Sequence, residues 1–274
     1  MLRIPSVLLL LALLFCWMPV HANAEQRIGV VLLHGKLGPP MGESTGTKAS
    51  IGGRLIYDLK KAGYVVAAPQ MCWSQARGFD RTYPDCLAEI GSAVAGLKAQ
   101  GATAVVVGGL SMGGGAAIAY GALHPEVAGI IGFAPADDPV VKAQQRPRIN
   151  EDIARARSLV QQGRADEKGR FYDYNTGPRG FFDINLRTTP RIYLSFFEPG
   201  SLANIGANAP KLRVPLSWIA GSADPTSASG RAGFDRATPN PLNRYVTVSA
   251  SHLEVPDAGA SAVLAWLKEL QQPH

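Results

Sequence analysis

The sequence of 274 residues has little of the chemistry that metal, redox and nucleic-acid sites require. It has three cysteines, five histidines and no C-x-x-C motif, so nothing in it supports a zinc ribbon or a dithiol redox site. The formal net charge of +6 is spread along the chain, without a run of five like charges or a basic stripe interleaved with aromatic residues. We therefore expect no metal ion, no cofactor and no nucleic-acid partner.

Long apolar runs are also absent from most of the chain, and the exception lies at its beginning. Arg3 precedes an almost wholly apolar stretch at 7–20, and an A-x-A pattern completes residues 1–24. This order is typical of a secretory signal peptide, so we expect the mature chain, 25–274, to be periplasmic or secreted and without a stable membrane anchor. An uncleaved anchor is the alternative, but Pro19 interrupts the run, which is shorter than the roughly 20 residues that span a bilayer.

Removal of that segment leaves two cysteines, Cys72 and Cys86. In an exported chain two cysteines favour a disulfide, because the compartment is oxidising. A bridge that closes a loop of about 15 residues contributes roughly 3 kcal/mol in the chain-entropy model. Two buried thiols are the alternative.

Apolar strand-like runs alternate with segments of helical periodicity through the rest of the chain. We expect strands at 27–33, 64–68, 104–107, 127–133, 214–220 and 245–248, and helices at 55–59, 87–97, 112–123 and 259–270. Runs that are apolar throughout indicate strands buried on both faces, and alternation with helices indicates parallel pairing. The sequence therefore predicts an open, doubly wound α/β sheet.

One stretch, 136–213, breaks this alternation. It contains a strand-like run at 191–197, a polar helix candidate near 151–162 and an aromatic, glycine-rich patch at 171–182. A connection of this length inside a compact domain is usually functional. We expect an insertion that caps the carboxyl edge of the sheet.

The strongest motif is Gly-Leu-Ser-Met-Gly at 109–113, which fits the G-x-S-x-G nucleophile elbow. A buried strand precedes it, and a helix rich in alanine and glycine follows. The sharp turn strains the serine backbone and leaves no room for side chains at the flanking glycines. We expect Ser111 to stand at the end of its strand, above a helix N-terminus that favours negative charge. An ordinary serine in a tight turn is the alternative.

A serine nucleophile needs a base, and elimination among the histidines leaves His252. His124 ends the elbow helix, about 18 Å from the serine at 1.5 Å per residue. His34 follows the first strand, where it more readily orders a loop. His252 lies in a short loop after the last strand, at the edge where the base must lie. A surface loop histidine is the alternative.

The base in turn needs a carboxylate to orient it and to stabilise its charged form. Asp224 follows the strand at 214–220 in the sequence Gly-Ser-Ala-Asp, and we prefer it. Asp235 lies beyond another loop, and Glu254 and Asp257 follow the histidine too closely to face it readily. The chain order is then Ser, Asp, His.

These motifs resemble those of α/β-hydrolase fold serine hydrolases, the superfamily of esterases, lipases and dienelactone hydrolases. The resemblance rests on the His-Gly pair at 34–35, the elbow at 109–113, GSAD at 221–224 and His252, and it covers almost the whole mature chain. It implies the α/β-hydrolase fold, a mostly parallel, doubly wound sheet. The insertion at 136–213 then falls between the sixth and seventh strands of the family fold, where caps are common.

The resemblance also implies an oxyanion hole. In the family, the residue after the nucleophile, here Met112, donates one N–H. The loop after the His-Gly pair donates the second, most readily from Lys36 and next from Leu37. The loop reads HGKLG here instead of the HGGG of some esterases. Each such donor contributes about 2.7–4 kcal/mol of transition-state stabilisation.

The activity that the resemblance implies is hydrolysis of a small-molecule carboxylic ester through an acyl-enzyme on Ser111. A peptidase or thioesterase on the same triad, and a catalytically silent exported binding protein, are the alternatives. Leu37 and Trp73 are candidate pocket residues; a loop held by Cys72 and Cys86, with its aromatic residues packed for stability, is the alternative for Trp73. The Lys36 side chain either favours an anionic substrate or is simply solvated. The sequence leaves the oligomeric state open.

Overall fold

The computed structural model describes residues 26–44, 50–177 and 180–272. Its six-stranded sheet is entirely parallel. The predicted signal peptide, 1–24, lies outside the described residues. Six strands pair in the order β2-β1-β3-β4-β7-β8. Their bounds are Ile28–Leu33 for β1, Val65–Ala67 for β2, Ala104–Leu110 for β3, Gly129–Phe133 for β4, Leu216–Gly221 for β7 and Arg244–Val248 for β8. The chain therefore has the predicted α/β-hydrolase arrangement, with a strand in each of the six predicted segments.

Both faces of the sheet are buried, which explains why its central strands are apolar throughout. In β1, Val31 and Leu33 pack into one core cluster, while Val30 and Leu32 pack into another on the opposite face. Successive side chains of a strand point to opposite faces, so two covered faces require an unbroken apolar run.

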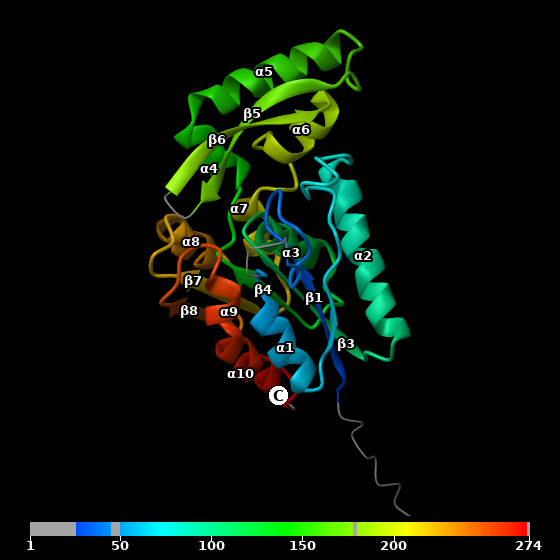
Figure 1. Ribbon diagram of the computed structural model, residues 1–274, viewed down its shortest axis with the longest axis vertical. Helices are drawn as coiled ribbons and strands as arrows, with labels where there is room; N and C mark the ends of the chain where they lie inside the picture. The colour runs from blue at the N-terminus through cyan, green and yellow to red at the C-terminus, as the bar shows by residue number, and fades with distance from the viewer. Residues whose placement is uncertain (1–25, 45–49, 178–179, 273–274) are drawn as a thin grey trace, which may run out of the picture.

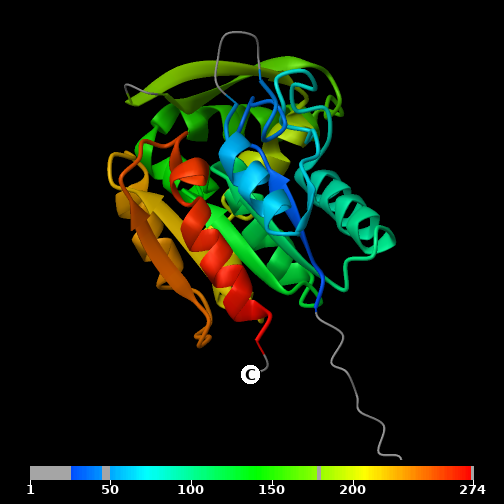
Figure 2. The same cartoon turned by 60° about the horizontal axis from the view of Figure 1, so that its bottom comes forward.

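Helices cover the two faces of the sheet. The first face carries α2 (Tyr83–Ala99), α3 (Met112–Leu123) and α8 (Ser227–Phe234); the second carries α1 (Gly53–Lys61), α9 (Val255–Ala258) and α10 (Ala260–Leu270). Figure 2 shows α10, in red, and α1, in light blue, lying together on the same side of the strands. Within the described residues, no helix combines the length and the apolar character that crossing a bilayer requires.

Residues 136–213, which we term the cap segment, connect β4 to β7. They form α4 (Pro139–Gln145), α5 (Pro147–Gln161), β5 (Gly169–Gly177), β6 (Gly180–Thr188), α6 (Pro190–Phe197), α7 (Ile205–Asn208) and a 3-10 turn at Ala209–Lys211. The aromatic patch of the sequence is an antiparallel hairpin of β5 and β6. In Figure 1 this hairpin, α4, α5 and α6 form a layer at the top, over one end of the sheet.

The strand expected at 191–197 is wrong, because these residues form α6. Thr189 caps the helix by accepting a hydrogen bond from the Ile192 N–H at 3.3 Å, and proline occupies the first helical position. Tyr193, Phe196 and Phe197 recur at helical spacing and are all buried. Short apolar runs do not distinguish a strand from a helix by periodicity alone.

Candidate active site

The predicted site residues gather at one edge of the sheet. His34 follows β1, Ser111 follows β3, Asp224 follows β7 and His252 follows β8. Because these strands are parallel, their carboxyl ends meet at the same edge. A cavity of about 620 Å³ lies there, and its lining includes His34, Ser111 and His252 from the core together with Thr176 and other residues of the cap hairpin.

Ser111 has the strained backbone of a nucleophile elbow, with φ 57° and ψ −119°. Its N–H donates to the carbonyl of Phe133 on β4 at 2.9 Å. A Cβ on Gly109 would stand 2.4 Å from the carbonyl carbon of Gly113, and a Cβ on Gly113 would stand 2.6 Å from the carbonyl oxygen of Leu33. Glycine at both positions therefore permits the turn that presents the serine.

Asp224 and His252 form a buried pair. The Nδ1 atom of His252 lies 2.8 Å from Oδ2 of Asp224, and the other carboxylate oxygen accepts hydrogen bonds from the N–H and the hydroxyl of Thr226 at 2.8 and 2.9 Å. Burial opposes ionisation of Asp224, but the hydrogen bonds from His252 and Thr226 outweigh it and hold its pKa below the usual value. An ionised carboxylate only accepts hydrogen bonds, so Nδ1 carries the ring proton.

The remaining ring nitrogen of His252, Nε2, is buried and has no hydrogen-bond partner within the described residues. With Nδ1 protonated, this nitrogen holds a lone pair that is free to take a proton. His252 lines the same cavity as Ser111. The arrangement therefore provides a base that lines the same cavity as a strained serine.

The other acidic candidates have different partners. Asp235 forms an exposed ion pair with Arg231. Asp257 accepts from backbone N–H groups at the start of α1, and Glu254 accepts from the N–H and hydroxyl of Ser251. Asp224 is thus the carboxylate that the fold brings to His252.

Two backbone N–H groups near the serine are unpaired within the described part of the chain, those of Met112 and Lys36. The Leu37 N–H is not available, because it donates to the carbonyl of Trp73 at 2.9 Å. Leu37 takes a left-handed conformation with φ 54°, and the Gly38 N–H closes the turn onto the Gly35 carbonyl at 3.1 Å. We term residues 35–38 the oxyanion loop.

His34 organises this loop, as expected from its position. Its Nδ1 donates to the Gly35 carbonyl at 2.8 Å, and its Nε2 accepts from the Met71 N–H at 2.9 Å. Burial lowers the pKa of His34 from 6.5 to about 4; the charge of Arg77 acts in the same direction, and the hydrogen bond to Gly35 acts against it. His34 is therefore a neutral structural residue.

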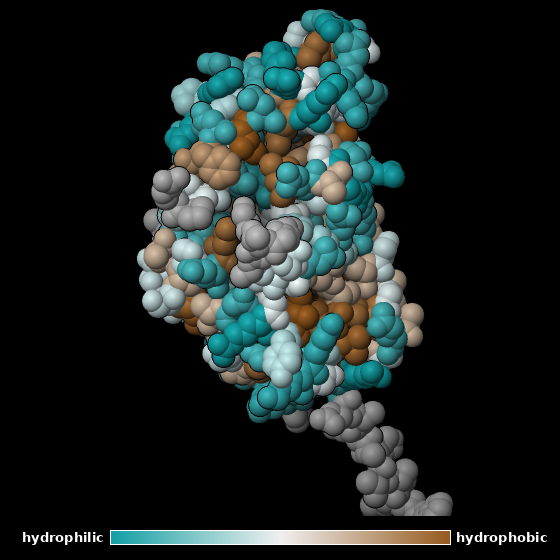
Figure 3. Space-filling view, viewed as in Figure 1, coloured by the Kyte–Doolittle hydropathy of each residue, from teal (hydrophilic) through white to brown (hydrophobic). Residues whose placement is uncertain are grey.

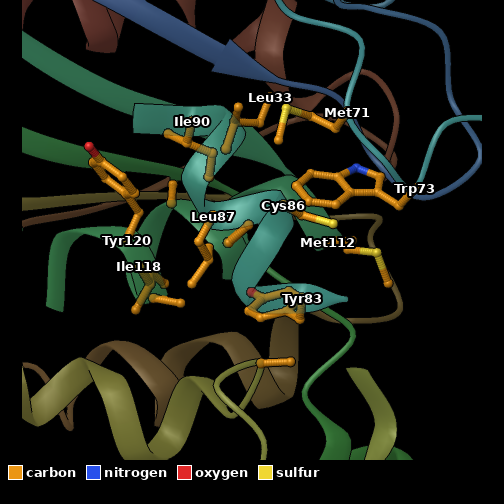
Figure 4. Close-up of a cluster of buried hydrophobic side chains, with 14 of the residues drawn as sticks. Leu33, Met71, Trp73, Tyr83, Cys86, Leu87, Ile90, Met112, Ile118 and Tyr120 are labelled. Carbon is orange, nitrogen blue, oxygen red and sulfur yellow. The ribbon is translucent and has the colours of Figure 1, made fainter. Parts of the chain in front are cut away.

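Trp73 does not line the cavity, contrary to the sequence expectation, whereas Leu37 does. Trp73 is fully buried, and its indole N–H donates to the His34 carbonyl at 2.9 Å. Figure 4 shows it among Leu33, Met71 and Cys86 in the core. Its loop is held by the disulfide between Cys72 and Cys86, so the aromatic residue packs for stability.

The side chain of Lys36 is neither solvated nor free to bind an anion. Its Nζ lies 2.7 Å from a carboxylate oxygen of Asp137 and 2.7 Å from one of Asp173, and it donates to the Tyr174 carbonyl at 2.5 Å. Lys142 shares these acceptors. Sequence reasoning missed Asp137, Lys142 and Asp173, because they are spread over the insertion and belong to no motif.

No group of three potential metal-ligating side chains occurs within residues 26–44, 50–177 and 180–272.

A sequence model of the alpha/beta hydrolase family matches residues 30–266. The chain belongs to the alpha/beta hydrolase family. Membership makes it a hydrolase, and Ser111, Asp224 and His252 all lie inside the matched region. A comparison with curated protein sequences found no match.

Solved structures share the alpha/beta hydrolase fold with the chain. A monoacylglycerol lipase of Paleococcus ferrophilus is 21% identical with a TM-score of 0.61, and the alignment covers 90% of this chain and 95% of that one. A structure from work on the metagenome-derived lipolytic enzymes LipS and LipT is 20% identical, with a TM-score of 0.59 and coverage of 91% and 95%. Est1E of Butyrivibrio proteoclasticus is 15% identical, with a TM-score of 0.57 and coverage of 91% and 90%. At these identities the likeness concerns the fold.

Proposed function

We propose that the protein is a serine hydrolase that cleaves small carboxylic esters through an acyl-enzyme on Ser111. One observation carries the proposal. The Nε2 atom of His252 is buried and unpaired among the described residues, in the lining of the cavity that also contains the strained serine, while Asp224 holds the opposite ring nitrogen. A histidine fixed in one tautomer with its basic nitrogen free is what activation of a serine hydroxyl requires.

The reaction begins when Ser111 Oγ attacks the ester carbonyl carbon and passes its proton to Nε2 of His252. The carbonyl oxygen becomes an oxyanion and accepts hydrogen bonds from the N–H groups of Met112 and Lys36. The imidazolium, stabilised by Asp224, then protonates the departing alkoxide. Water, deprotonated by the same nitrogen, attacks the acyl-serine. As the bond to Ser111 Oγ breaks, the imidazolium returns the proton to this oxygen and the carboxylic acid leaves.

The cavity favours a neutral, largely apolar ester. Its lining includes Leu37, Met41, Ile51, Phe182 and Leu253. Phe182 is 50% exposed and Leu253 is 36% exposed. Figure 3 shows further apolar side chains at the surface near the boundary below the cap segment.

The charges near the cavity also act against an anionic substrate. The ammonium group of Lys36 is neutralised by two carboxylates. Glu43, Glu254 and Asp257 line the cavity as well and repel anions. A neutral ester avoids this repulsion and uses the apolar walls.

Labelling with a fluorophosphonate probe tests the proposal, on the parent and on Ser111→Ala in parallel. The parent should be labelled and the variant should not be. Asp235→Asn is a matched control, because this carboxylate lies outside the triad in an exposed ion pair, and it should be labelled like the parent. A folded parent that is not labelled would refute the activated serine.

A substrate panel then separates the acyl chemistries. Neutral p-nitrophenyl esters of increasing acyl length should be hydrolysed faster than matched acyl thioesters and peptide anilides. A preference for thioesters or anilides would keep the triad and assign the chain to the thioesterases or peptidases. A preference for esters with a carboxylate on the acyl chain would contradict the substrate charge inferred here.

We also propose that the protein acts outside the cytoplasm. The signal-like residues 1–24 support this location, and so does the disulfide between Cys72 and Cys86, because such bonds persist in oxidising compartments. Fractionation of cells that express the full chain, with an antibody against the mature part, tests it. Recovery in the cytoplasm alone would refute it.

A further inference from the structure

Four buried charges lie together where the cap segment meets the oxyanion loop. Lys36 and Lys142 supply two positive charges, and Asp137 and Asp173 supply two negative ones. Their side chains are between 0% and 8% exposed. We term these residues the charge cluster.

Both lysines of the charge cluster use the same three acceptors. Lys36 Nζ contacts Asp137, Asp173 and the carbonyl of Tyr174, and Lys142 Nζ contacts Asp137 at 2.8 Å, Asp173 at 2.5 Å and the same carbonyl at 3.2 Å. An ammonium group has three N–H donors, so each lysine is fully satisfied. Burial opposes ionisation of Asp137, but the two ammonium groups outweigh it and hold its pKa well below the usual range. The cluster is neutral as a whole and fixed in geometry.

The cluster joins three parts of the site. Lys36 belongs to the oxyanion loop, Asp173 to strand β5 of the cap hairpin, and Asp137 to the loop after β4. That last loop also contacts the elbow, because the Ala136 N–H donates to the carbonyl of Ser111 at 3.1 Å. A short path of contacts therefore runs from the serine to the loop that offers the second oxyanion donor.

Net stabilisation does not explain such a cluster well. Burying four charges is expensive, and apolar side chains of similar volume often serve stability equally well or better. The attested benefit of buried ionic groups is that they specify one geometry. An oxyanion hole needs this, because its donors must lie about 2.7–3.1 Å from the position of the developing charge.

We propose that Lys36 is a positioning residue of the reaction. Its side chain, held by Asp137 and by Asp173 of the cap hairpin, fixes the oxyanion loop so that the backbone N–H of the same residue meets the transition state. The cap is thereby a structural part of the oxyanion hole. This inference rests on the proposed function, because it assigns a role within that reaction.

The test compares Lys36→Met with Lys142→Met, which are matched because both remove one buried ammonium group from the same acceptors. Lys36→Met keeps the backbone N–H of residue 36 but no longer holds it in position. The value of kcat on a neutral ester should therefore fall by about 10- to 100-fold, which is less than the loss when a donor is deleted outright. The value of KM should stay within about twofold of the parent's. Lys142→Met should lose a similar amount of stability towards urea. Its kcat should fall much less, because both carboxylates still hold Lys36.

A double variant separates geometry from general stability. Lys36→Met combined with Asp173→Asn restores the balance of charge, leaving Lys142 with Asp137. Its urea midpoint should recover relative to the single variant, and its kcat should stay low. Equal kcat losses in the two lysine variants, or a kcat that recovers together with stability, would overturn the proposal. If Lys36→Met alone does not fold, the kcat of the double variant is compared with that of Asp173→Asn alone, because these two variants differ only at Lys36.

Amide hydrogen exchange provides a readout that does not depend on activity. The Leu37 N–H, bonded to the carbonyl of Trp73, should exchange faster in Lys36→Met than in Lys142→Met. Equal exchange in both variants would contradict the positioning role. The two proposals fail in different ways. If the two lysine variants differ in exchange but the parent shows neither probe labelling nor turnover, the proposed function is refuted, while the role of Lys36 in fixing the oxyanion loop stands.

Discussion

The neutral state of His34 predicts a specific dependence of stability on pH. In the folded chain Nδ1 donates to Gly35 and Nε2 accepts from the Met71 N–H, so a second proton would face a donor in a buried site. Burial accordingly lowers the pKa of His34 from 6.5 to about 4. Between these values the unfolded chain binds the proton and the folded chain does not, so stability falls as the pH falls through this window.

The size of the effect follows from the two pKa values of His34. The whole difference corresponds to about 3 kcal/mol, of which about 2 kcal/mol is lost between pH 7 and pH 5. The carboxylates of Asp224 and Asp137 have lowered pKa values, so their contributions are lost only at more acidic pH. Above pH 5 these two carboxylates therefore contribute little, and comparison with a variant that does not titrate at position 34 isolates the contribution of His34.

Urea unfolding of the parent and of His34→Gln at pH 7, 6 and 5 measures this contribution. Glutamine keeps an acceptor for Met71 and does not titrate, so the parent should lose about 2 kcal/mol more than the variant between pH 7 and 5. Equal losses would refute the reasoning. A proton resonance of the His34 ring that titrates near pH 6.5 in the folded parent would refute it too, and this measurement does not depend on the folding of the variant.

Three further predictions concern the site and its support. Asp224→Asn should lower kcat/KM for a neutral ester by about 10⁴-fold, because the amide favours the wrong tautomer of the histidine; Asp235→Asn, assayed alongside, should match the parent. Gly113→Ala should abolish probe labelling and lower the urea midpoint, since its Cβ would lie 2.6 Å from a backbone oxygen; unchanged labelling would contradict the elbow geometry. Replacing Cys72 and Cys86 with serine should cost about 3 kcal/mol of unfolding free energy in urea, and a loss below about 1 kcal/mol would contradict the chain-entropy estimate.

The six-stranded sheet was predictable because its burial leaves a simple trace in the sequence. Runs such as those of β1 and β3 are apolar throughout, since helices cover both faces. The elbow and Asp224 were predictable for a related reason. Each follows such a run directly, and a short loop after a strand keeps the side chain at the carboxyl edge of the sheet.

The cap segment was less predictable because its elements pack against one another and not on a regular sheet. The apolar run at 191–197 favours a strand, but Tyr193, Phe196 and Phe197 have helical spacing and the run forms α6. Trp73 was misplaced for a different reason. It follows the disulfide cysteine Cys72, and the loop turns inward, so its indole donates to the carbonyl of His34 instead of facing a ligand.

Lys36 shows most clearly where a local interpretation of sequence ends. A lysine in a short loop between Gly35 and Gly38 is ordinarily solvated, and nothing nearby in the sequence suggests otherwise. Its partners Asp137 and Asp173 lie 101 and 137 residues further along the chain. The fold of the cap segment brings both carboxylates to the ammonium group, Asp137 from the loop after β4 and Asp173 from the cap hairpin.

The segment from His34 to Lys36 is thus held from two opposite directions by different chemistry. On the core side, His34 is held by neutral hydrogen bonds to a loop that a disulfide restrains. On the cap side, Lys36 is held by ion pairs with Asp137 of the loop after β4 and with Asp173, and the second of these forms only when the hairpin is in place. Opening the hairpin would separate buried charges from their partners, which is strongly unfavourable. For the proposed hydrolase we therefore expect substrate to enter past exposed apolar residues such as Phe182 and Leu253 while the cap remains docked.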